Sequence, residues 1–140
     1  MDASLLSDLA WQAKKHWGYP DEWMALWQED LMVSPEMIET HQVWKAICKE
    51  EIAGFIIITD LGDGFEIEHC FVKPTFIGKG CGKALVRHVM DQADYQGARF
   101  TVLSDPNAVA FYEKFGFETY EHIPSKPEGR SLPLMRMVNS

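Results

Sequence analysis

The sequence predicts an α+β fold in which helices flank a mixed, mostly antiparallel central sheet. Segments with helical spacing of apolar residues and segments rich in β-branched and aromatic residues follow one another in the order α-α-β-β-β-α-β-α-β-β. This order is neither the strict alternation of a doubly wound sheet nor an all-β pattern. The chain has 140 residues and contains no repeats or low-complexity segments. Residues 1–140 are therefore expected to form a single domain.

The first forty residues are expected to be helical. Apolar residues recur at helical spacing in residues 4–15, with Ser4 as a candidate cap, and again in residues 21–31 after Pro20. Four of the five tryptophans lie before residue 28. Their simplest role is to pack this helical pair against the sheet. The alternative is that the aromatic loop HWGYP, residues 16–20, lines a pocket, because a loop does not need aromatic residues for packing.

The remaining elements follow from apolar runs separated by turn residues. A helix is expected after the glycines near residue 80 and another after Pro106, capped by Ser104 or Asp105. The loop at residues 124–129 precedes Arg130, which is either a carboxylate anchor at a substrate lip or a surface residue. Strands are expected at residues 42–48, 51–59, 66–72, 99–103, 117–123 and 132–138.

The stretch EIEHCFVKPTFIGKGCGKALVR, residues 66–87, combines a buried strand, a glycine-rich turn and the start of a helix. Glycines keep bulky side chains away from the backbone amides, and free amides at a helix N-terminus form an anion site. The chain carries a formal net charge of −8, yet residues 69–90 contain no Asp or Glu and four Lys or Arg. This local basic region favours a phosphate-bearing ligand. The alternative is that the glycines only permit a tight turn.

Composition excludes several functional classes. No apolar run approaches the ~20 residues that span a bilayer, and the N-terminus lacks a signal peptide's apolar core. The three cysteines are unclustered, which favours reduced thiols in the cytoplasm over disulfides or a metal site. The acidic balance disfavours non-specific binding of nucleic acid. We therefore expect a cytoplasmic protein with no membrane, metal or nucleic-acid partner.

Two motifs in order, FVKPTFIGKGCGKALV and TVLSDPNAVAFYEKFGF, resemble the GNAT superfamily of acetyl-CoA-dependent N-acyltransferases over residues 40–120. The resemblance implies that acetyl-CoA is the cosubstrate and that an amine of a small molecule or peptide accepts the acetyl group. Two features depart from the family pattern. Ile77 stands where a Gln or Arg usually begins the loop, and a helix begins at Ser4 where a first strand is usual. Many members of the family pair as homodimers, and an uncovered sheet edge would favour pairing here.

Carried over by position, the resemblance assigns the coenzyme contacts. The amides of Lys79, Gly80, Cys81, Gly82 and Lys83 would hold the pyrophosphate, and a Val side chain at Gly80 or Gly82 is expected to block binding. The backbone of residues 70–72 would pair with the pantetheine arm as an added strand. Asn107 would contact the same arm, and Tyr112 would stand near the sulfur. The resemblance thus implies backbone contacts from Cys70, Phe71 and Val72 on the strand.

Amine attack on a thioester needs a base, an oxyanion donor and an acid for the leaving thiolate. Glu68 is the first choice for the base and Glu66 the second, because period two places both on one strand face. His69 is expected on the opposite face. Phe71 or Val72 could donate its amide to the oxyanion, and Tyr112 could protonate the thiolate. A non-catalytic acyl-CoA-binding module would need only the glycine turn and is the alternative function.

Overall fold

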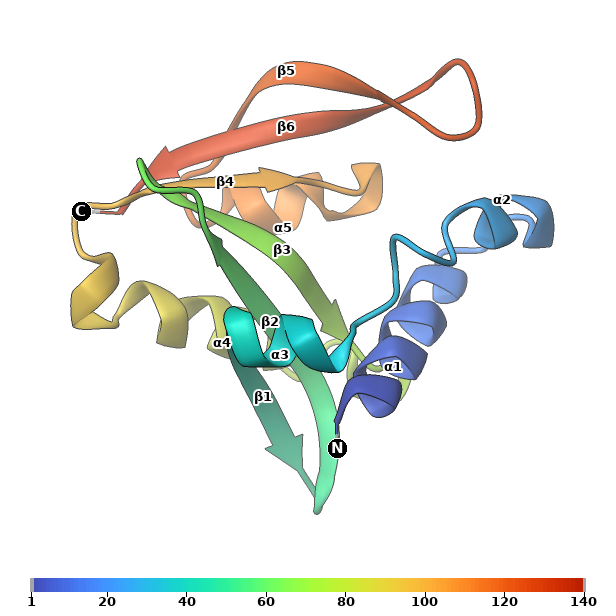
Figure 1. Cartoon of the computed structure of the whole chain (residues 1–140), viewed down its shortest axis with the longest axis horizontal. Helices are drawn as coiled ribbons and strands as arrows, with labels where there is room; N and C mark the ends of the chain where they lie inside the picture. The colour runs from blue at the N-terminus through green and yellow to red at the C-terminus, as the bar shows by residue number, and fades with distance from the viewer. Residues whose placement is uncertain (1, 140) are drawn as a thin grey trace.

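The computed structural model describes residues 2–139 and builds them around one six-stranded sheet (Figure 1). The strand order is β1-β2-β3-β4-β6-β5. All neighbouring strands are antiparallel except β3 and β4, which run parallel. The predicted class, α+β with a mixed and mostly antiparallel sheet, is confirmed. The strands are β1 (Gln42–Cys48), β2 (Glu51–Asp60), β3 (Phe65–Val72), β4 (Arg99–Leu103), β5 (Glu118–Ser125) and β6 (Arg130–Val138).

Helices cover parts of both sheet faces. In the described residues helices precede the first strand, as the sequence predicts, and a third short helix joins the two of the predicted order. Ser4 lies inside the first helix and does not cap it; Asp2 holds the cap position without a side-chain bond. The five helices are α1 (Ala3–His16), α2 (Asp21–Leu26), α3 (Pro35–Thr40), α4 (Cys81–Met90) and α5 (Val109–Glu113). No helix within residues 2–139 combines the length and apolarity that crossing a membrane requires.

The sheet separates two apolar cores. Residues 53–58 of β2 are all buried, because α4 covers one face of this strand and the α1–α2 layer covers the other. Ile56 and Ile58 belong to the core beneath α4 and α5, whereas Phe55 and Ile57 belong to the core beneath α1 and α2. Side chains alternate between the two faces of a strand, so one segment contributes to both cores.

The parallel strands β3 and β4 are paired only at one end. Their pairing runs from Phe65 with Phe100 to Ile67 with Val102, and β3 then continues to Val72 without β4 beside it. The two ribbons diverge from that point (Figure 1). The sheet therefore has an opening between β3 and β4, which we call the β3–β4 opening.

Two predicted segments differ in extent. The second helix ends at Leu26 and continues as turns to Leu31, so it is shorter than the expected helix over residues 21–31. The expected loop at residues 124–129 is shortened to a turn over residues 126–129, because β5 extends to Ser125 and β6 begins at Arg130. Cross-strand pairing of Ser125 with Arg130 leaves only a short hairpin turn. Arg130 consequently has a fixed position at the start of a strand.

Candidate active site

The N-terminus of α4 has the features of an anion site. Gly80 is its N-cap residue in a left-handed conformation, φ 82°, and provides no side-chain cap. Among residues 2–139, no carbonyl outside the helix accepts a hydrogen bond from the amides of residues 80–83. Lys79, Lys83 and Arg87 are exposed and make no ion pair within the same range, whereas Lys73 is paired with Glu51 at 2.7 Å. Unpaired amides and three uncompensated cations can together bind a phosphate group.

Gly82 has a different role from the one expected. A Cβ atom at Gly82 would lie 3.3 Å from the ring of Phe111 and 3.4 Å from Val72. Gly82 therefore lets α4 pack closely against α5 and β3, and its missing side chain does not face the open loop. A Cβ at Gly80 would meet no atom within 4 Å, so only Gly80 fits the expectation of open space.

Backbone amides of β3 point into the β3–β4 opening. The amide of Lys73 donates to the carbonyl of Ala53 on β2 at 2.7 Å. Because hydrogen bonds alternate along an antiparallel strand, Phe71 also bonds to β2, and the peptide groups of Cys70 and Val72 point the other way. Of the two expected oxyanion donors, Val72 therefore has the suitable direction and Phe71 does not.

A β-bulge at Glu68 changes the sheet face on which the following side chains of β3 lie. Ile57 of β2 pairs with His69 and the next residue, Ile58, pairs with Ile67, which leaves Glu68 without a partner. Ile67 packs in the core beneath α4, but the ring of His69 lies 6.2 Å from that of Phe55 in the other core. The expectation that His69 faces away from the two glutamates was therefore wrong, because a bulge interrupts the period of two.

The carboxyl groups of Glu66 and Glu68 interact on the α1–α2 face of the sheet. Glu66 is partly buried, while Glu68 is exposed and accepts a hydrogen bond from Thr59 at 3.2 Å. Burial, reinforced by the charge of Glu68, raises the pKa of Glu66 to about 7. Burial lowers the pKa of His69, although the nearby Glu68 opposes this shift. At neutral pH, Glu66 can therefore exchange a proton and His69 is mostly uncharged.

Tyr112 lies on the opposite face, beneath the opening. It is 5% exposed in the core formed with α4, and the Cys70 side chain packs against the same core. Burial, together with the neighbouring thiol of Cys70, raises the pKa of Tyr112 well above its usual value. Burial also raises the pKa of Cys70 to about 12, so this thiol stays protonated. At neutral pH Tyr112 therefore keeps a proton that it could donate, and a protonated Cys70 thiol is unsuited to act as a nucleophile.

A polar cluster follows the C-terminal end of β4. The hydroxyl of Tyr19 donates to Asp105 at 3.0 Å, and Asn107 donates to Tyr19 at 3.1 Å. Lys14 forms an ion pair with Asp105, and Arg130 donates to the Tyr19 hydroxyl at 3.0 Å. Burial alone would raise the pKa of Asp105, but the hydrogen bond and charge of Lys14 outweigh burial and lower it.

The N-terminal tryptophans pack against this cluster. The rings of Trp23 and Trp27 are 6.0 Å apart, and Tyr19 lies edge-on to Trp27 at 4.9 Å. The cations of Lys14 and Arg130 lie over the Trp27 ring at 4.8 and 4.6 Å. The chain's own cations therefore occupy this aromatic group, which excludes it as an empty cage for a cationic ligand.

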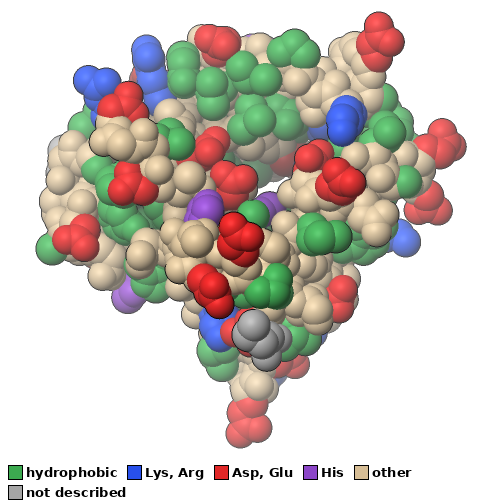
Figure 2. Space-filling model, in the orientation of Figure 1, with side chains coloured by type: hydrophobic (Ala, Val, Ile, Leu, Met, Phe, Trp, Pro, Cys, Tyr) green, Lys and Arg blue, Asp and Glu red, His purple; other side chains and the backbone are tan. Residues whose placement is uncertain are grey.

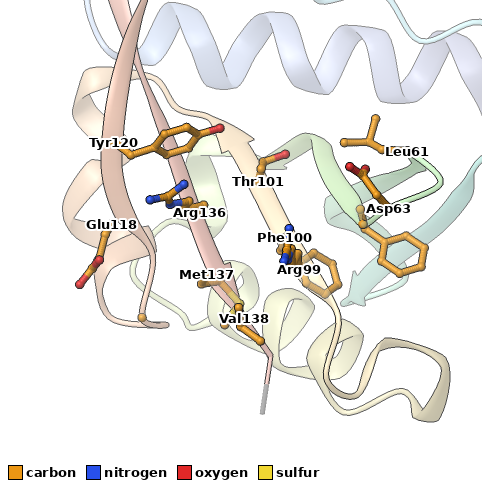
Figure 3. A pocket seen from close by; sticks show the side chains of 13 residues that line it. Leu61, Asp63, Arg99, Phe100, Thr101, Glu118, Tyr120, Arg136, Met137 and Val138 are labelled. Carbon is orange, nitrogen blue, oxygen red and sulfur yellow. The ribbon is translucent and has the colours of Figure 1, made fainter.

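A hollow of about 720 Å³ lies where β3 and β4 begin and β6 ends, and residues of the core beneath α4 form part of its lining. Arg136 lies against the ring of Tyr120 at 4.3 Å within it, with Thr101 on the neighbouring strand (Figure 3). Glu66 pairs with Thr101, so the hollow begins one strand from Glu66. Figure 2 shows a separate depression near the centre of the view, with acidic and histidine side chains around it.

No group of three potential metal ligands occurs among residues 2–139. The described residues provide backbone amides, cationic side chains, carboxyl groups and a phenol around the β3–β4 opening. This combination can bind a phosphate-bearing ligand along β3 and move protons on both faces of the sheet.

Comparison with protein families decides the classification. A model described as an acetyltransferase (GNAT) domain matches residues 19–138. The chain belongs to the GNAT family. The resemblance noted in the sequence motifs is thereby confirmed, and the match extends to the N-terminal aromatic loop and the β5–β6 hairpin.

Individual relatives and solved structures show which members of the family this GNAT chain resembles. It is 29% identical over 99 residues to the peptidyl-lysine N-acetyltransferase YjaB of Salmonella typhimurium, covering 69% of this chain and 63% of that protein. The matched region thus spans less than two thirds of that relative's length. The fold resembles a GCN5-related N-acetyltransferase from Rhodopseudomonas palustris, with a TM-score of 0.78, 20% identity and coverage of 99% and 89%. It also resembles PaiA N-acetyltransferase from Thermoplasma acidophilum in complex with coenzyme A, with a TM-score of 0.73, 17% identity and coverage of 98% and 92%.

Most of the site residues predicted from the sequence lie around the β3–β4 opening of this GNAT chain. The glycine turn, residues 70–72 and Tyr112 lie along it, and Asn107 lies at its far side in the polar cluster. Sequence reasoning missed Lys14, Tyr19 and Asp105 as one group. The sequence singled out the aromatic loop and Arg130 separately, but it contained no signal that they meet across 111 positions.

Proposed function

We propose that this GNAT chain is an N-acetyltransferase that transfers the acetyl group of acetyl-CoA directly to a primary amine of a small molecule or peptide. The observation that carries the proposal is the β3–β4 opening, which lies beside the unpaired amides and cations at the start of α4. Family membership supports the reaction type. YjaB is a peptidyl-lysine N-acetyltransferase and PaiA binds coenzyme A, which is consistent with the same cosubstrate here.

The coenzyme-binding residues follow from these features. The free amides from Gly80 to Lys83 would hold the pyrophosphate, with the lysine side chains adding charge. The amide of Lys79 already donates to the carbonyl of Phe76 at 3.3 Å, which removes it from the set expected from the sequence. The outward-pointing peptide group of Cys70 and the carbonyl of Val72 would pair with the pantetheine arm, which leaves the amide of Val72 for the oxyanion. Asn107 stands across the opening, where it would reach the same arm. Exposed Ile77 replaces a polar contact usual in the family, but it leaves the amides free.

Proton removal is assigned to Glu66. Acetyl-CoA supplies the acetyl group: the amine nitrogen bonds to the thioester carbon, and the carbon–sulfur bond breaks. Glu66 takes the amine proton, since its partly buried carboxyl has a pKa of about 7. Glu66 is four residues from Cys70, roughly 13 Å along the strand, so the proton would reach it through a chain of water molecules. Burial thus favours Glu66 over Glu68, which reverses the order expected from the sequence.

Tyr112 completes the proton balance on the other sheet face. Its hydroxyl protonates the departing thiolate, and its raised pKa keeps it protonated beforehand. The amide of Val72 donates a hydrogen bond to the developing oxyanion. The base and the acid therefore lie on opposite faces, so the departing thiol does not compete with the amine for the same proton carrier.

Calorimetric titration with acetyl-CoA, CoA and ATP tests the binding part. Acetyl-CoA and CoA are each expected to bind one site saturably, whereas ATP is expected not to bind. A double substitution, Lys79→Gln with Lys83→Gln, should weaken acetyl-CoA binding about 3–10-fold, since exposed charges each contribute modestly. The matched control, Lys15→Gln with Lys114→Gln, removes the same charge elsewhere and should leave affinity unchanged. Equal affinities for the two double variants would contradict the anion site.

Tyr112→Phe tests the acid. We expect turnover to fall about 10²-fold, because general acid catalysis contributes 10²–10⁴-fold, while the Kd for acetyl-CoA stays within about twofold. Thiol release in the presence of excess amine measures turnover, and calorimetry measures the Kd. Wild-type turnover in the variant would remove the leaving-group role. A wild-type chain that binds acetyl-CoA but acetylates no amine would instead be a non-catalytic acyl-CoA-binding module.

A further inference from the structure

Arg130 occupies an unusual environment for an arginine at the start of a strand. Its side chain is only 12% exposed, and its guanidinium carbon lies 4.6 Å from the centre of the Trp27 ring and 5.1 Å from that of Tyr19. One nitrogen, Nη2, donates to the Tyr19 hydroxyl at 3.0 Å. Stacking on two rings and this hydrogen bond hold the guanidinium in one orientation.

The guanidinium nevertheless keeps unused donors. Among residues 2–139, Nε and Nη1 of Arg130 have no hydrogen-bond partner. In the same residues every fully buried side-chain nitrogen or oxygen has a hydrogen-bond partner. Because Nε and Nη1 have none, both contact solvent. A guanidinium presents five N–H donors in a rigid fork that matches a carboxylate. Arg130 therefore offers a fixed, accessible edge suited to a planar anion.

The local charge balance also favours an anion. Lys14 and Arg130 contribute two positive charges, and Asp105 contributes one negative charge. Asp105 is already engaged by Lys14, by Tyr19 and by the backbone amide of Asn107 at 2.8 Å. Its nearest oxygen is 3.9 Å from Arg130, too far for a hydrogen bond. The cluster keeps a net positive charge in a chain whose formal net charge is −8.

Measured along β3 and β4, the polar cluster lies at the same position as Cys70, where the acetyl group would be transferred. Ile67 pairs with Val102 across the parallel strands, and Cys70 and Asp105 each follow three residues later. Arg130 is next to Asp105 and is on the α1–α2 face, the face of Glu66. A small acceptor at the opening could therefore direct its amine towards Cys70 and another group towards Arg130.

We propose that the acceptor is an amine that also carries a carboxylate, as a free amino acid does, and that Arg130 binds this carboxylate. The proposal rests on the proposed acetyltransferase function and specifies its substrate class. Lys14 and Asp105 hold the site's charge and geometry, and the aromatic rings exclude water from one side of the guanidinium. Arg130 acts as a specificity residue and takes no proton.

The test compares matched acceptor pairs with acetyl-CoA as donor: lysine with 1,5-diaminopentane, methionine with 3-(methylthio)propylamine, and phenylalanine with phenethylamine. At least one amino acid is expected to have a KM about tenfold or more below that of its decarboxylated partner, since a charged hydrogen bond contributes 1.5–3 kcal/mol. Arg130→Gln should raise that KM by a similar factor with little change in kcat. It should leave kcat/KM for the decarboxylated amine within about twofold.

Two further variants keep the test decisive. Arg130→Lys retains the charge without the fork, so its KM should lie between those of the wild type and Arg130→Gln. Arg136→Gln removes another arginine of the same strand and face and should alter neither acceptor. Thermal unfolding identifies a variant that fails to fold, in which case Arg130→Lys alone decides.

The outcomes separate the two proposals. Acetylation of amines without a preference for the carboxylate, or equal losses for both members of a pair, would overturn the role of Arg130 while the acetyltransferase function stands. Acetyl-CoA binding with no acetylation of any amino acid would also overturn it. Failure to bind acetyl-CoA would instead overturn the proposed function.

Discussion

Glu66→Gln is expected to lower kcat at neutral pH by about 10²–10⁴-fold, the range that a general base contributes. Gln has nearly the same shape as Glu but cannot accept the amine proton. Binding of acetyl-CoA should stay within about twofold, because Glu66 is remote from the α4 N-terminus. Steady-state thiol release at saturating acetyl-CoA and amine, with calorimetric Kd values, measures both quantities.

The pH profile gives this prediction a second readout. The pKa of Glu66 is raised to about 7, so wild-type turnover should rise with pH around that midpoint and then level off. Glu66→Gln should abolish this rise. Stability should follow the opposite direction. Between pH 4.5 and about 7 the folded chain retains a proton that the unfolded chain has released. The free energy of unfolding therefore contains a favourable contribution at low pH that is lost as pH rises through this window.

Glu68→Gln and His69→Gln are the matched controls. Glu68 is exposed and raises the pKa of Glu66 through its charge, so Glu68→Gln should keep most activity and shift the pH midpoint downward. His69 lies on the same face, nearer to the opening. If His69→Gln abolished turnover and Glu66→Gln did not, the assignment of the base to Glu66 would be wrong.

Much of the fold could be predicted because local patterns determine it. The apolar run at residues 55–58 identifies a buried strand, and the glycine turn followed by helical spacing identifies the start of α4. Ser34 and Asp105 cap their elements as side-chain chemistry predicts, accepting bonds from Met37 and Asn107. These features depend on neighbours within a few positions, so a single sequence contains the information.

The site could be predicted only in part, because its remaining features depend on tertiary contacts. The bulge at Glu68 arises from pairing with β2, so the period of two misplaced His69. The raised pKa of Glu66 depends on its burial in the folded chain, and the sequence alone ranked the exposed Glu68 above it. Arg130 was predicted after a loop, whereas strand pairing with Ser125 and the rings of Tyr19 and Trp27 fix its position.

The glycines of the turn illustrate the same limit and lead to the second large effect. Gly82→Val is expected to lower the free energy of unfolding by about 1–3 kcal/mol, the usual cost of overpacking. The added side chain would begin 3.3 Å from the Phe111 ring and 3.4 Å from Val72, and its two methyl groups would extend further. Gly82 is absent from the positive-φ glycines, so backbone strain does not contribute. Urea unfolding monitored by circular dichroism measures the change.

A double-mutant cycle identifies the cause of this destabilisation. Phe111→Leu removes ring atoms that a valine at position 82 would contact, so the double variant should be more stable than the sum of the single effects predicts. Gly78→Ala serves as the control for backbone strain, because Gly78 has a φ of 84° and open space around its Cβ position. Strictly additive effects would show that Phe111 does not limit position 82. If Gly82→Val instead kept wild-type stability and weakened acetyl-CoA binding, the steric effect would act at the pyrophosphate site, as the sequence suggested.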